Sequence, residues 1–463
     1  MSEIYIRDFE GKHVHFIGIG GISMSGLAEI LLEKGCKVSG SDLKQSGLTE
    51  CLQKNGAVIY QGHAPQNVHG ADLIVYTAAV KDDNVEMMEA KKQQIPVMDR
   101  ATLLGQIMET YRHAIGIAGT HGKTTTTSII AVMMYRANLD PTILVGGELD
   151  EIGGNVHTGK SEIFITESCE YMDSFLKFYP KIAIILNIEK DHLDYFKDIN
   201  HIYSSFLKYA RRVPEWGTVI GCGDDPLVRK LMEEVNCNVI SYGIDRPADW
   251  TASRITYNQK GGGSSFYVEN KGRELGEFTI KLPGKHNIYN ALASIAACDL
   301  MGLTKEQMKK TLSEYGGIHR RFEIKGRTGK KAIVIDDYAH HPSEVKATIN
   351  AAKNYPHNRI WCVFQPHTYT RTKELFNEFT DAFSGVDRLI LADIYAAREK
   401  DPGNINSKML AEAIAEKGMN SIYMSGFEEI AAYLNEHSKQ DDLIITMGAG
   451  DVYKIGDMLL QNK

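Results

Sequence analysis

Short apolar runs alternate with helix-like stretches along most of the chain. In the first part, apolar runs predict strands over 13–18, 36–42, 57–62 and 72–80, and a stretch that ends in glycine predicts a helix over 22–35. Strands separated by helical stretches are typical of a parallel sheet with crossover helices. The first part of the chain is therefore predicted to be an α/β unit.

The same alternation begins again after residue 112. A strand is expected over 112–120 and a helix over 127–138, and residues 251–280 are expected to form a small antiparallel excursion. A third series begins near residue 323, in which each apolar run is followed by a helical stretch. The further strands predicted in the second and third parts cover 162–168, 181–192, 331–341, 358–367, 387–397 and 442–450, and a further helix covers 287–302.

The chain of 463 residues is long enough for about three domains. We predict them at 1–112, 113–322 and 323–463, because the strand and helix series restarts near residues 112 and 322. The apolar fraction of 43% and the charged fraction of 24% are ordinary for a soluble globular protein. The predicted fold class is therefore α/β with three domains.

Charge and composition argue against several classes of function. The net charge of −7 gives no overall basic field, so we expect no binding to nucleic acid or to a membrane surface. The first residues, MSEIYIRDFEGK, lack the apolar core of a secretory signal, and no apolar run approaches the ~20 residues of a membrane span. We therefore expect a cytoplasmic protein. The seven cysteines contain no C-x-x-C pair, which argues against a disulfide framework and a thiolate zinc site.

A glycine-rich turn, GIAGTHGKTTTT, follows the strand predicted at the start of the second part. The usual Gly-x4-Gly-Lys-Thr spacing would need glycine where this chain has Ile117. Glycines let backbone N–H groups face a phosphate, a lysine contacts the β- and γ-phosphates, and a hydroxyl binds Mg²⁺. The turn therefore predicts a triphosphate site, with Lys123 on the phosphates and Thr124 on Mg²⁺. The alternative is a turn in which the threonines only cap the helix.

Two later strands of the second part end in polar clusters, one containing Glu167 and the other His192. If both strands run parallel to the strand before the glycine turn, the clusters surround the γ-phosphate, because ligands gather at the carboxyl ends of parallel strands. The Glu167 carboxylate suits Mg²⁺. Imidazole favours softer metals, so a structural role for His192 stays equally open. Three neighbouring acidic residues are expected to be solvated or to cap locally: Glu189, Asp191 and Asp194.

The first part of the chain has a glycine turn of its own, HFIGIGGISMSG. Gly18, Gly20 and Gly21 lie between strand and helix, but the dinucleotide pattern G-x-G-x-x-G would need glycine at Ser23. Asp42 ends the second strand, where an acidic group can bind a ribose hydroxyl. Taken alone, this turn allows an NAD-dependent oxidoreductase, although the same geometry binds any nucleotide diphosphate. Two such turns in one chain favour a nucleotide-linked substrate together with ATP.

Seven motifs occur in order across nearly the whole chain. They are HFIGIGGISMSGLAEIL, GIAGTHGKTTTT, NIEKDHLDYF, PGKHNIYNALA, HRRFE, DDYAHHPSE and FQPHTYTRT. In this combination the chain resembles the Mur ligases of peptidoglycan synthesis, whose form of the phosphate loop is GTHGKT. The resemblance implies a Rossmann-like N-terminal domain that binds a UDP-sugar and a central P-loop ATPase domain with a mainly parallel sheet. It also implies a Rossmann-like C-terminal domain that closes on ATP and the amino acid.

The resemblance implies a reaction as well. ATP would phosphorylate the carboxylate of UDP-N-acetylmuramic acid, the amine of L-alanine would attack the acyl phosphate, and phosphate would leave. ATP and Mg²⁺ are the expected cofactors, and the enzyme is expected to be a monomer or a homodimer. The nearest alternative attaches the preformed tripeptide L-alanyl-γ-D-glutamyl-meso-diaminopimelate to the same sugar nucleotide. A UDP-sugar sensor and an oxidoreductase are further alternatives.

Site residues follow from the motifs in four groups. Those expected to take part in catalysis are Lys123, Glu167, His192, Arg321, Asp337, His340 and Arg371. ATP would contact Gly119, Thr120, His121, Gly122, Lys123, Thr124, Thr125, Asn287, Asn290 and Arg321, and Mg²⁺ would be held by Thr124, Glu167 and His192. The UDP-sugar would contact Gly18, Gly20, Gly21, Ser41 and Asp42, and L-alanine would contact Tyr338, His340 and Arg371.

Several of these residues also have a plain structural interpretation. Such alternatives are a helix cap or polar surface for Asn287 and Asn290, a solvated arginine for Arg321, and helix-start histidines for His340 and His341. Several Mur ligases use a carbamylated lysine downstream of the His192-type motif. Lys208 lies there but one residue out of register, so we expect an exposed, unmodified helix lysine.

Overall fold

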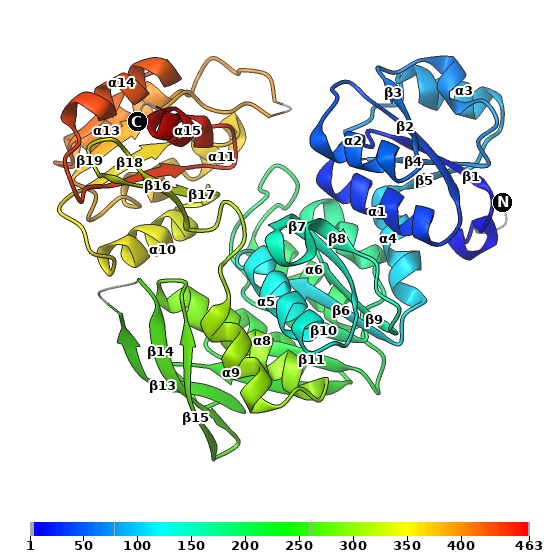
Figure 1. Cartoon of the computed structure of the whole chain (residues 1–463), viewed down its shortest axis with the longest axis horizontal. Helices are drawn as coiled ribbons and strands as arrows, with labels where there is room; N and C mark the ends of the chain where they lie inside the picture. Colours follow the sequence, from blue (N-terminus) through cyan, green and yellow to red (C-terminus); the bar gives the residue numbers. More distant parts are fainter. Residues whose placement is uncertain (1–3, 78, 259–261, 398, 462–463) are drawn as a thin grey trace.

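A computed structural model describes residues 4–77, 79–258, 262–397 and 399–461, which form three sheets in chain order. The sheets lie in separate lobes, with the first and third lobes on opposite sides above the central one (Figure 1). All three lobes combine helices with mainly parallel sheets, which confirms the predicted fold class. The domain boundaries near residues 112 and 322 stay predictions.

The first sheet is entirely parallel, in the order β3-β2-β1-β4-β5. Its strands are β1 (His13–Ile17), β2 (Lys37–Asp42), β3 (Val58–Gln61), β4 (Leu73–Tyr76) and β5 (Val97–Asp99). Its helices are η1 (Ile6–Phe9), α1 (Ile22–Glu33), α2 (Gly47–Lys54), η2 (Pro65–Val68), α3 (Val85–Lys92) and α4 (Arg100–Glu109). The order reverses at β1, and ligands bind at such switch points beyond the carboxyl ends of the strands.

The central sheet has the order β15-β14-β13-β12-β11-β10-β6-β9-β7-β8. Its strands are β6 (His113–Ala118), β7 (Thr142–Leu149), β8 (Gly154–His157), β9 (Ile163–Glu167), β10 (Ile182–Ile185), β11 (Thr218–Cys222), β12 (Asn238–Gly243), β13 (Trp250–Tyr257), β14 (Ser264–Asn270) and β15 (Arg273–Ile280). The helices are α5 (Lys123–Arg136), η3 (Asp150–Ile152), η4 (Tyr171–Lys177), α6 (Ile199–Ala210), α7 (Pro226–Glu233), α8 (Lys285–Leu300) and α9 (Lys305–Glu314). At one edge of this sheet, β14 pairs antiparallel with both β13 and β15, as predicted for residues 251–280.

The third sheet has the order β16-β17-β21-β18-β19-β20, and its pairs are parallel except for β16 with β17. Its strands are β16 (Glu323–Arg327), β17 (Ile333–Asp337), β18 (Ile360–Phe364), β19 (Arg388–Leu391), β20 (Ser421–Tyr423) and β21 (Leu443–Met447). Its helices are α10 (Pro342–Lys353), α11 (Tyr369–Glu374), α12 (Phe376–Thr380), α13 (Ser407–Glu416), α14 (Phe427–His437) and α15 (Tyr453–Gln461). Strands β17, β18 and β21 are buried throughout, as expected where helices cover both faces of a sheet.

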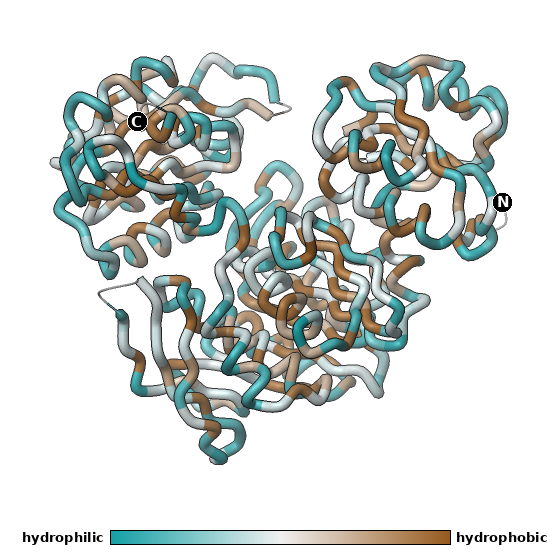
Figure 2. The backbone as a smooth tube through the Cα atoms, viewed as in Figure 1, coloured by the Kyte–Doolittle hydropathy of each residue, from teal (hydrophilic) through white to brown (hydrophobic). Residues whose placement is uncertain are grey.

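The three lobes are joined in different ways. One apolar cluster runs from the first lobe into the central one, for example from Leu27 and Leu104 to Phe164 and Phe206. The core of the third lobe is built mainly from its own residues, with Leu193 of the central lobe packed against it. Figure 2 shows the apolar strands gathered inside each lobe. The first and central lobes therefore share a core, whereas the third lobe has its own.

Several predicted strands are too long. Strand β4 ends at Tyr76, β10 ends at Ile185 and β19 ends at Leu391, because the chain beyond these points leaves the sheet as a loop. Residue 78 of the predicted strand 72–80 and residues 259–261 of the antiparallel excursion lie outside the described residues. Within the described part of the chain, no helix is both long and apolar enough to cross a membrane.

Candidate active site

The glycine turn of the central sheet connects β6 to α5. Gly122 caps α5 with a φ of 83°, and Gly119 has a φ of 145°, both in the region that favours glycine. A Cβ at Gly119 would lie 2.9 Å from the Leu186 Cβ, and a Cβ at Gly122 would lie 2.6 Å from the Asn290 Oδ1. The turn therefore requires glycine at both positions and leads directly into a helix N-terminus, where anions bind favourably.

Lys123 begins α5 and folds back over the turn. Its Nζ lies 3.0 Å from the Glu170 Oε2 and donates to the Thr120 carbonyl oxygen at 3.2 Å. Burial lowers the pKa of Lys123, but the Glu170 carboxylate outweighs it and holds the pKa above its ordinary value. The turn thus contains a lysine that stays charged.

Thr124 and Glu167 approach two adjacent glycines of β7. The Gly146 N–H donates to the Glu167 Oε1 at 2.7 Å, and a Cβ at Gly147 would lie 3.5 Å from the Thr124 Cγ2. Strand β9, which ends at Glu167, runs parallel to β6, as the expected strand-end cluster requires. The hydroxyl and the carboxylate are hard oxygen donors of the kind that suits Mg²⁺.

His192 lies in the loop after β10, which also runs parallel to β6. Its Nε2 lies 3.9 Å from the Glu170 Oε1, and its ring packs 4.7 Å from the ring of Tyr171. Glu170 therefore contacts Lys123 and approaches His192, and its side chain connects the two polar clusters that the sequence predicts.

The expectation that Asp191 is solvated is wrong. Its residue is 7% exposed, and its Oδ1 accepts hydrogen bonds from the Arg371 Nε at 3.2 Å and Nη2 at 3.0 Å. Burial raises the pKa of Asp191, but the charges of His192 and Arg371 lower it well below its ordinary value. Asp194, by contrast, is exposed as expected and accepts a hydrogen bond from the Tyr171 hydroxyl. Sequence alone could not show that a helix of the third lobe reaches Asp191.

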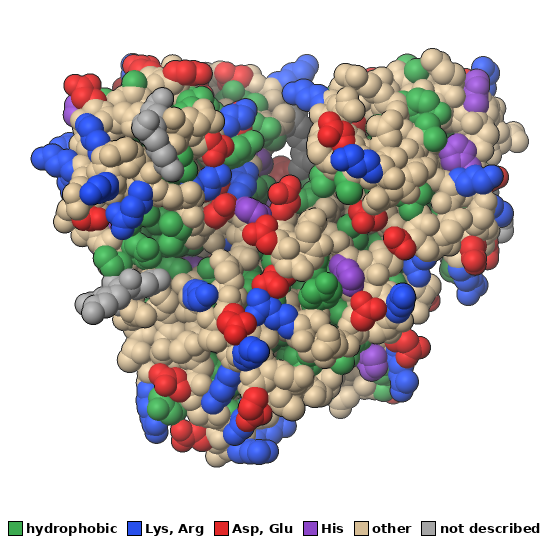
Figure 3. Space-filling view, viewed as in Figure 1, with side chains coloured by type: hydrophobic (Ala, Val, Ile, Leu, Met, Phe, Trp, Pro, Cys, Tyr) green, Lys and Arg blue, Asp and Glu red, His purple; other side chains and the backbone are tan. Residues whose placement is uncertain are grey.

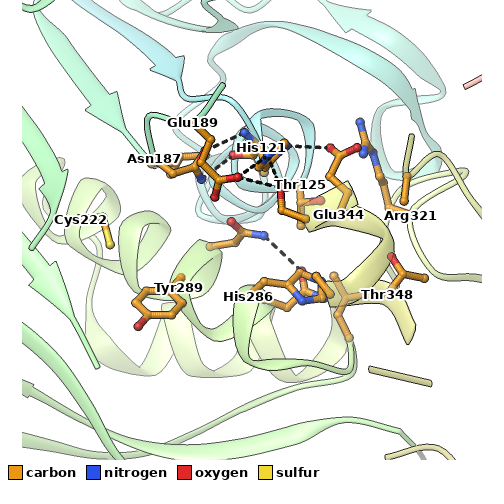
Figure 4. A pocket seen from close by; sticks show the side chains of 18 of the residues that line it. His121, Thr125, Asn187, Glu189, Cys222, His286, Tyr289, Arg321, Glu344 and Thr348 are labelled. Carbon is orange, nitrogen blue, oxygen red and sulfur yellow. Dashed lines mark hydrogen bonds and ion pairs between the residues drawn. The ribbon is translucent and has the colours of Figure 1, made fainter. Parts of the chain in front are cut away.

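A cavity of about 340 Å³ opens beside the turn, between the central and third lobes (Figure 4). The predicted site residues that line it are His121, Gly122, Thr125, Asn287, Asn290, Arg321 and Asp337. Asn287 and Asn290 are buried, so their interpretation as polar surface is wrong. The Asn287 Nδ2 donates to the Pro283 carbonyl at 2.8 Å, and the Asn290 Nδ2 donates to the Asn287 Oδ1 at 3.2 Å. These bonds fix both amides at the cavity wall.

His121 joins the turn to the third lobe. Its Nδ1 lies 3.2 Å from the Glu344 Oε1, and its Nε2 lies 3.3 Å from the Glu189 Oε2 and 3.0 Å from the Ser343 Oγ (Figure 4). Burial lowers the pKa of His121, but the two carboxylates raise it to about 10. His121 is therefore a cation at neutral pH, held by carboxylates from two lobes.

Arg321, Asp337 and Tyr338 form the third lobe's side of the cavity. The Arg321 Nη2 lies 3.5 Å from the Thr124 Oγ1, and its guanidinium lies 5.0 Å from the Tyr338 ring centroid, so Arg321 is not simply solvated. Burial raises the pKa of Asp337 to about 6, although its oxygens accept backbone N–H groups from Phe322 and Ala339, both at 2.8 Å. The cavity thus combines a fixed cation with an acid that titrates near neutrality.

The two adjacent histidines of the third lobe differ. His341 is the N-cap of α10, as the structural interpretation predicts, and its Nε2 lies 2.9 Å from the Lys190 carbonyl of the central lobe. The His340 Nδ1 lies 3.0 Å from the Tyr338 carbonyl, and burial lowers the pKa of His340 to about 3. His340 is therefore neutral and can serve only as a neutral hydrogen-bonding group.

Arg371 lies at a smaller recess of about 80 Å³, which it shares with His192. Beside its ion pair with Asp191, its Nη1 lies 3.1 Å from the His367 Nδ1. The rings of His340 and His367 are 5.6 Å apart. Arg371, which the sequence assigns to L-alanine, thus shares the recess with His192, which it assigns to Mg²⁺, and His340 approaches Arg371 through His367.

The glycine turn of the first lobe is closed by its own sheet. The Gly18 N–H donates to the Ser41 carbonyl at 2.8 Å, and the Gly20 N–H donates to the Asp42 Oδ2 at 2.9 Å. Gly21 caps α1. The Ser41 side chain is buried and donates to Glu86 at 2.5 Å, so it points away from solvent. Contact of the Ser41 hydroxyl with a ligand would require this hydrogen bond to change.

Some residues of the site were missed from sequence, although they lie inside the motifs. Ser343 and Glu344 belong to DDYAHHPSE and line the large cavity, and His367 belongs to FQPHTYTRT and lines the small recess. The available signal was that all three are polar residues inside motifs that already contained assigned positions. Lys208 is exposed on α6, as expected.

Three family models, all of Mur ligases, match consecutive parts of the chain. Residues 13–112 match the model described as "Mur ligase family, catalytic domain", residues 117–298 match "Mur ligase middle domain", and residues 320–450 match "Mur ligase, glutamate ligase domain". The chain belongs to the Mur ligase family.

Relatives of known name cover almost the full length. A UDP-N-acetylmuramate–L-alanine ligase of Acetivibrio thermocellus is 56% identical over 453 residues, which cover 98% of this chain and 96% of that protein. The protein of the same name from Caldanaerobacter subterraneus subsp. tengcongensis is 53% identical, over 99% of both chains. Among solved structures, the UDP-N-acetylmuramate-alanine ligase MurC of Thermotoga maritima has a TM-score of 0.83 at 27% identity and covers 97% of this chain and 98% of its own.

Proposed function

We propose that this chain is an ATP-dependent ligase that joins L-alanine to UDP-N-acetylmuramic acid during synthesis of peptidoglycan precursors. The observation that carries the proposal is the 56% identity to a UDP-N-acetylmuramate–L-alanine ligase over 98% of this chain. Cytoplasmic location and the oligomeric state, a monomer or a homodimer, stay predictions from the sequence.

The central turn fits a triphosphate with Mg²⁺. A side chain at Gly119 would collide with Leu186 and one at Gly122 with Asn290, and Lys123 supplies a charge inside the turn. Thr124, Glu167 and His192 would hold Mg²⁺, of which the first two offer the oxygens that this ion prefers. When bound, Mg²⁺ would neutralise phosphate charge. The wall of the large cavity formed by Asn287 and Asn290 would receive the nucleotide.

The proposed chemistry proceeds in two steps. A carboxylate oxygen of the muramoyl group attacks the γ-phosphorus of ATP, the bond to the β-phosphate oxygen breaks, and ADP leaves. The amine of L-alanine then attacks the acyl carbon, loses a proton, and expels phosphate. Oxide is a very poor leaving group whereas phosphate is a good one, which is why phosphorylation must come first. Lys123 and Arg321 would stabilise the phosphoryl oxygens, and positioning would provide most of the remaining rate enhancement.

The small recess offers a binding group for the carboxylate of an amino acid. It measures about 80 Å³ and contains Arg371, whose planar guanidinium suits a carboxylate. The preference for L-alanine over the tripeptide is supported by the relatives of 53–56% identity, which are named UDP-N-acetylmuramate–L-alanine ligases. Tyr338 and His340 would stand on the same side of the acyl group. The first-lobe turn, with Gly18, Gly20, Gly21, Ser41 and Asp42, would hold the UDP-sugar.

Product formation separates the proposal from its alternatives. Purified protein is given ATP, Mg²⁺ and UDP-N-acetylmuramic acid, and ADP release is measured with L-alanine, L-serine, glycine or the tripeptide. We expect the highest kcat/KM with L-alanine. Preference for the tripeptide would replace the assignment by the recycling reaction. Binding of the UDP-sugar without any ADP release would indicate a sensor, and NADH binding would favour an oxidoreductase.

A further inference from the structure

Asp191 and Arg371 form an ion pair between two lobes. Asp191 follows β10 of the central sheet, and Arg371 lies on α11 of the third lobe. The Asp191 Oδ1 accepts from two nitrogens of the guanidinium, at 3.2 Å and 3.0 Å. Both side chains are almost buried, with 8% and 11% exposed. Removal of one partner from a pair shielded in this way is costly, because the other charge is then buried without its partner.

The pair belongs to a polar seam between the two lobes. Three consecutive central residues take part: Glu189 accepts from the Ser343 Oγ at 2.7 Å, the Lys190 carbonyl bonds His341 at 2.9 Å, and Asp191 holds Arg371. The first and central lobes, in contrast, share an apolar cluster. The position of the third lobe therefore depends strongly on these polar contacts, and removal of one charge should change how this lobe packs on the central one.

The recess beside the pair is rich in carboxylates. Among the described residues that line it, Arg371 is the only lysine or arginine, whereas Asp191, Asp194, Glu374 and Glu399 all contribute acidic groups. An incoming carboxylate has one guanidinium to bind, and that guanidinium is already held by Asp191. Two carboxylates that contact the same guanidinium lie close enough to repel each other.

We infer that Asp191 is a placeholder for the carboxylate of the amino-acid substrate. In the unliganded enzyme it neutralises Arg371 and holds the third lobe against the central one. The substrate carboxylate takes over Arg371 only when Asp191 gives way. This inference rests on the proposed function, because it takes an α-amino acid as the ligand of the recess. Asp191 is thus a positioning residue that tunes amino-acid affinity and lobe closure.

The variant Asp191→Asn tests the placeholder. It keeps the size of the side chain and one acceptor oxygen for the His192 N–H, which Asp191 now binds at 2.7 Å, but removes the charge. We expect the KM for L-alanine to fall by about fivefold or more, because the substrate carboxylate no longer competes with the Asp191 carboxylate for Arg371. The KM values for ATP and the UDP-sugar should change much less. Small-angle X-ray scattering of the unliganded variant should show a larger radius of gyration than that of the wild type.

Asp99→Asn is a matched control. Asp99 also pairs across two lobes, with Lys177 at 2.7 Å, and caps α4, a task that asparagine performs equally well. This control should leave the KM for L-alanine unchanged. An unchanged or higher alanine KM in Asp191→Asn would overturn the inference, and an unchanged radius of gyration would overturn its claim about the third lobe. Absence of alanine-dependent ADP release in the wild-type enzyme would instead overturn the proposed function.

Discussion

The two glycine turns of this chain have the same local design and different surroundings. Each joins the first strand of a parallel sheet to the helix that follows it, in the first lobe before α1 and in the central lobe before α5. In the first turn the Gly20 N–H is bonded to Asp42 of the neighbouring strand. In the second turn Lys123 is present, and Glu344 and Arg321 reach in from the third lobe. Figure 3 shows the cleft between the first and third lobes, above the central one, with charged side chains of both signs at its rim.

This difference shows that a glycine turn specifies only a place for an anion. The reaction at that place depends on the residues that the neighbouring strands and lobes deliver. At the central turn these are the carboxylates of Glu167 and Glu170, together with cations from two lobes. We therefore expect substitutions at the central turn to abolish phosphoryl transfer and substitutions at the first turn to affect only binding of the sugar nucleotide.

Lys123→Ala gives the largest expected effect. Loss of the charge inside the turn should lower kcat for ADP release by at least about 10²–10³-fold. Binding of UDP-N-acetylmuramic acid, measured by calorimetry, should be retained because its site lies in the first lobe. Removal of Lys123 also leaves Glu170 buried without this partner, so the variant's unfolding must be measured in parallel. Loss of both activities in a folded variant would contradict the separation of the two sites.

Glu167→Gln should change the requirement for Mg²⁺. The amide keeps an oxygen near Gly146 but loses the charge, so the Mg²⁺ concentration that gives half-maximal rate should rise by about 10–100-fold. A titration of rate against Mg²⁺ measures this effect. Asp194→Asn, which removes an exposed carboxylate two residues after His192, is the control and should show the Mg²⁺ dependence of the wild type. Equal Mg²⁺ curves for all three proteins would exclude Glu167 as a ligand.

A pair of glycine substitutions compares the turns directly. Alanine at Gly122 would adopt a φ of 83° and meet the Asn290 Oδ1 at 2.6 Å, so the KM for ATP should rise by about tenfold. Alanine at Gly21 would adopt a φ of −68° with its nearest neighbour atom 3.7 Å away, and should leave the KM for ATP nearly unchanged. Steady-state kinetics with varied ATP measures both. Similar kinetic effects of the two substitutions would contradict the comparison.

Buried carboxylates near the two sites should respond oppositely to pH. Burial raises the pKa of Glu86, but the nearby His15 ring and hydrogen bonds from Ser41 and Asn67 outweigh it and lower the pKa to about 2. Its stabilising contribution is present above the ordinary value of 4.5 and is lost as pH falls from 4.5 to about 2. Burial raises the pKa of Asp337 to about 6, so the free energy of unfolding should fall as pH rises from 3.8 to about 6.

Urea unfolding across this pH range measures both changes in the free energy of unfolding, each expected to be about 3 kcal/mol. Glu86→Gln should flatten the acidic part of the curve, and Asp337→Asn should flatten the part between pH 4 and 6. If the free energy of unfolding of both variants depends on pH as it does in the wild type, these two groups do not titrate as their surroundings indicate.

Much of the fold was predictable from the sequence, because the apolar runs that form β1, β6, β18 and β21 are bounded by clear helical stretches. The glycine turns were predictable for the same reason, since each follows such a run. The partners of Asp191 and His121 were not, because Arg371 and Glu344 lie far along the chain and approach only when the third lobe packs on the central one. Local pattern specifies a strand end, whereas tertiary packing decides which charges meet there.

Oxygen-isotope transfer tests the central claim most directly. UDP-N-acetylmuramic acid labelled with oxygen-18 in its carboxylate is incubated with the enzyme, ATP, Mg²⁺ and L-alanine, and the released phosphate is analysed by mass spectrometry. The account predicts one labelled oxygen in each phosphate, because the carboxylate oxygen that attacks phosphorus leaves with it. Phosphate without the label, formed together with the alanine-linked product, would contradict the account.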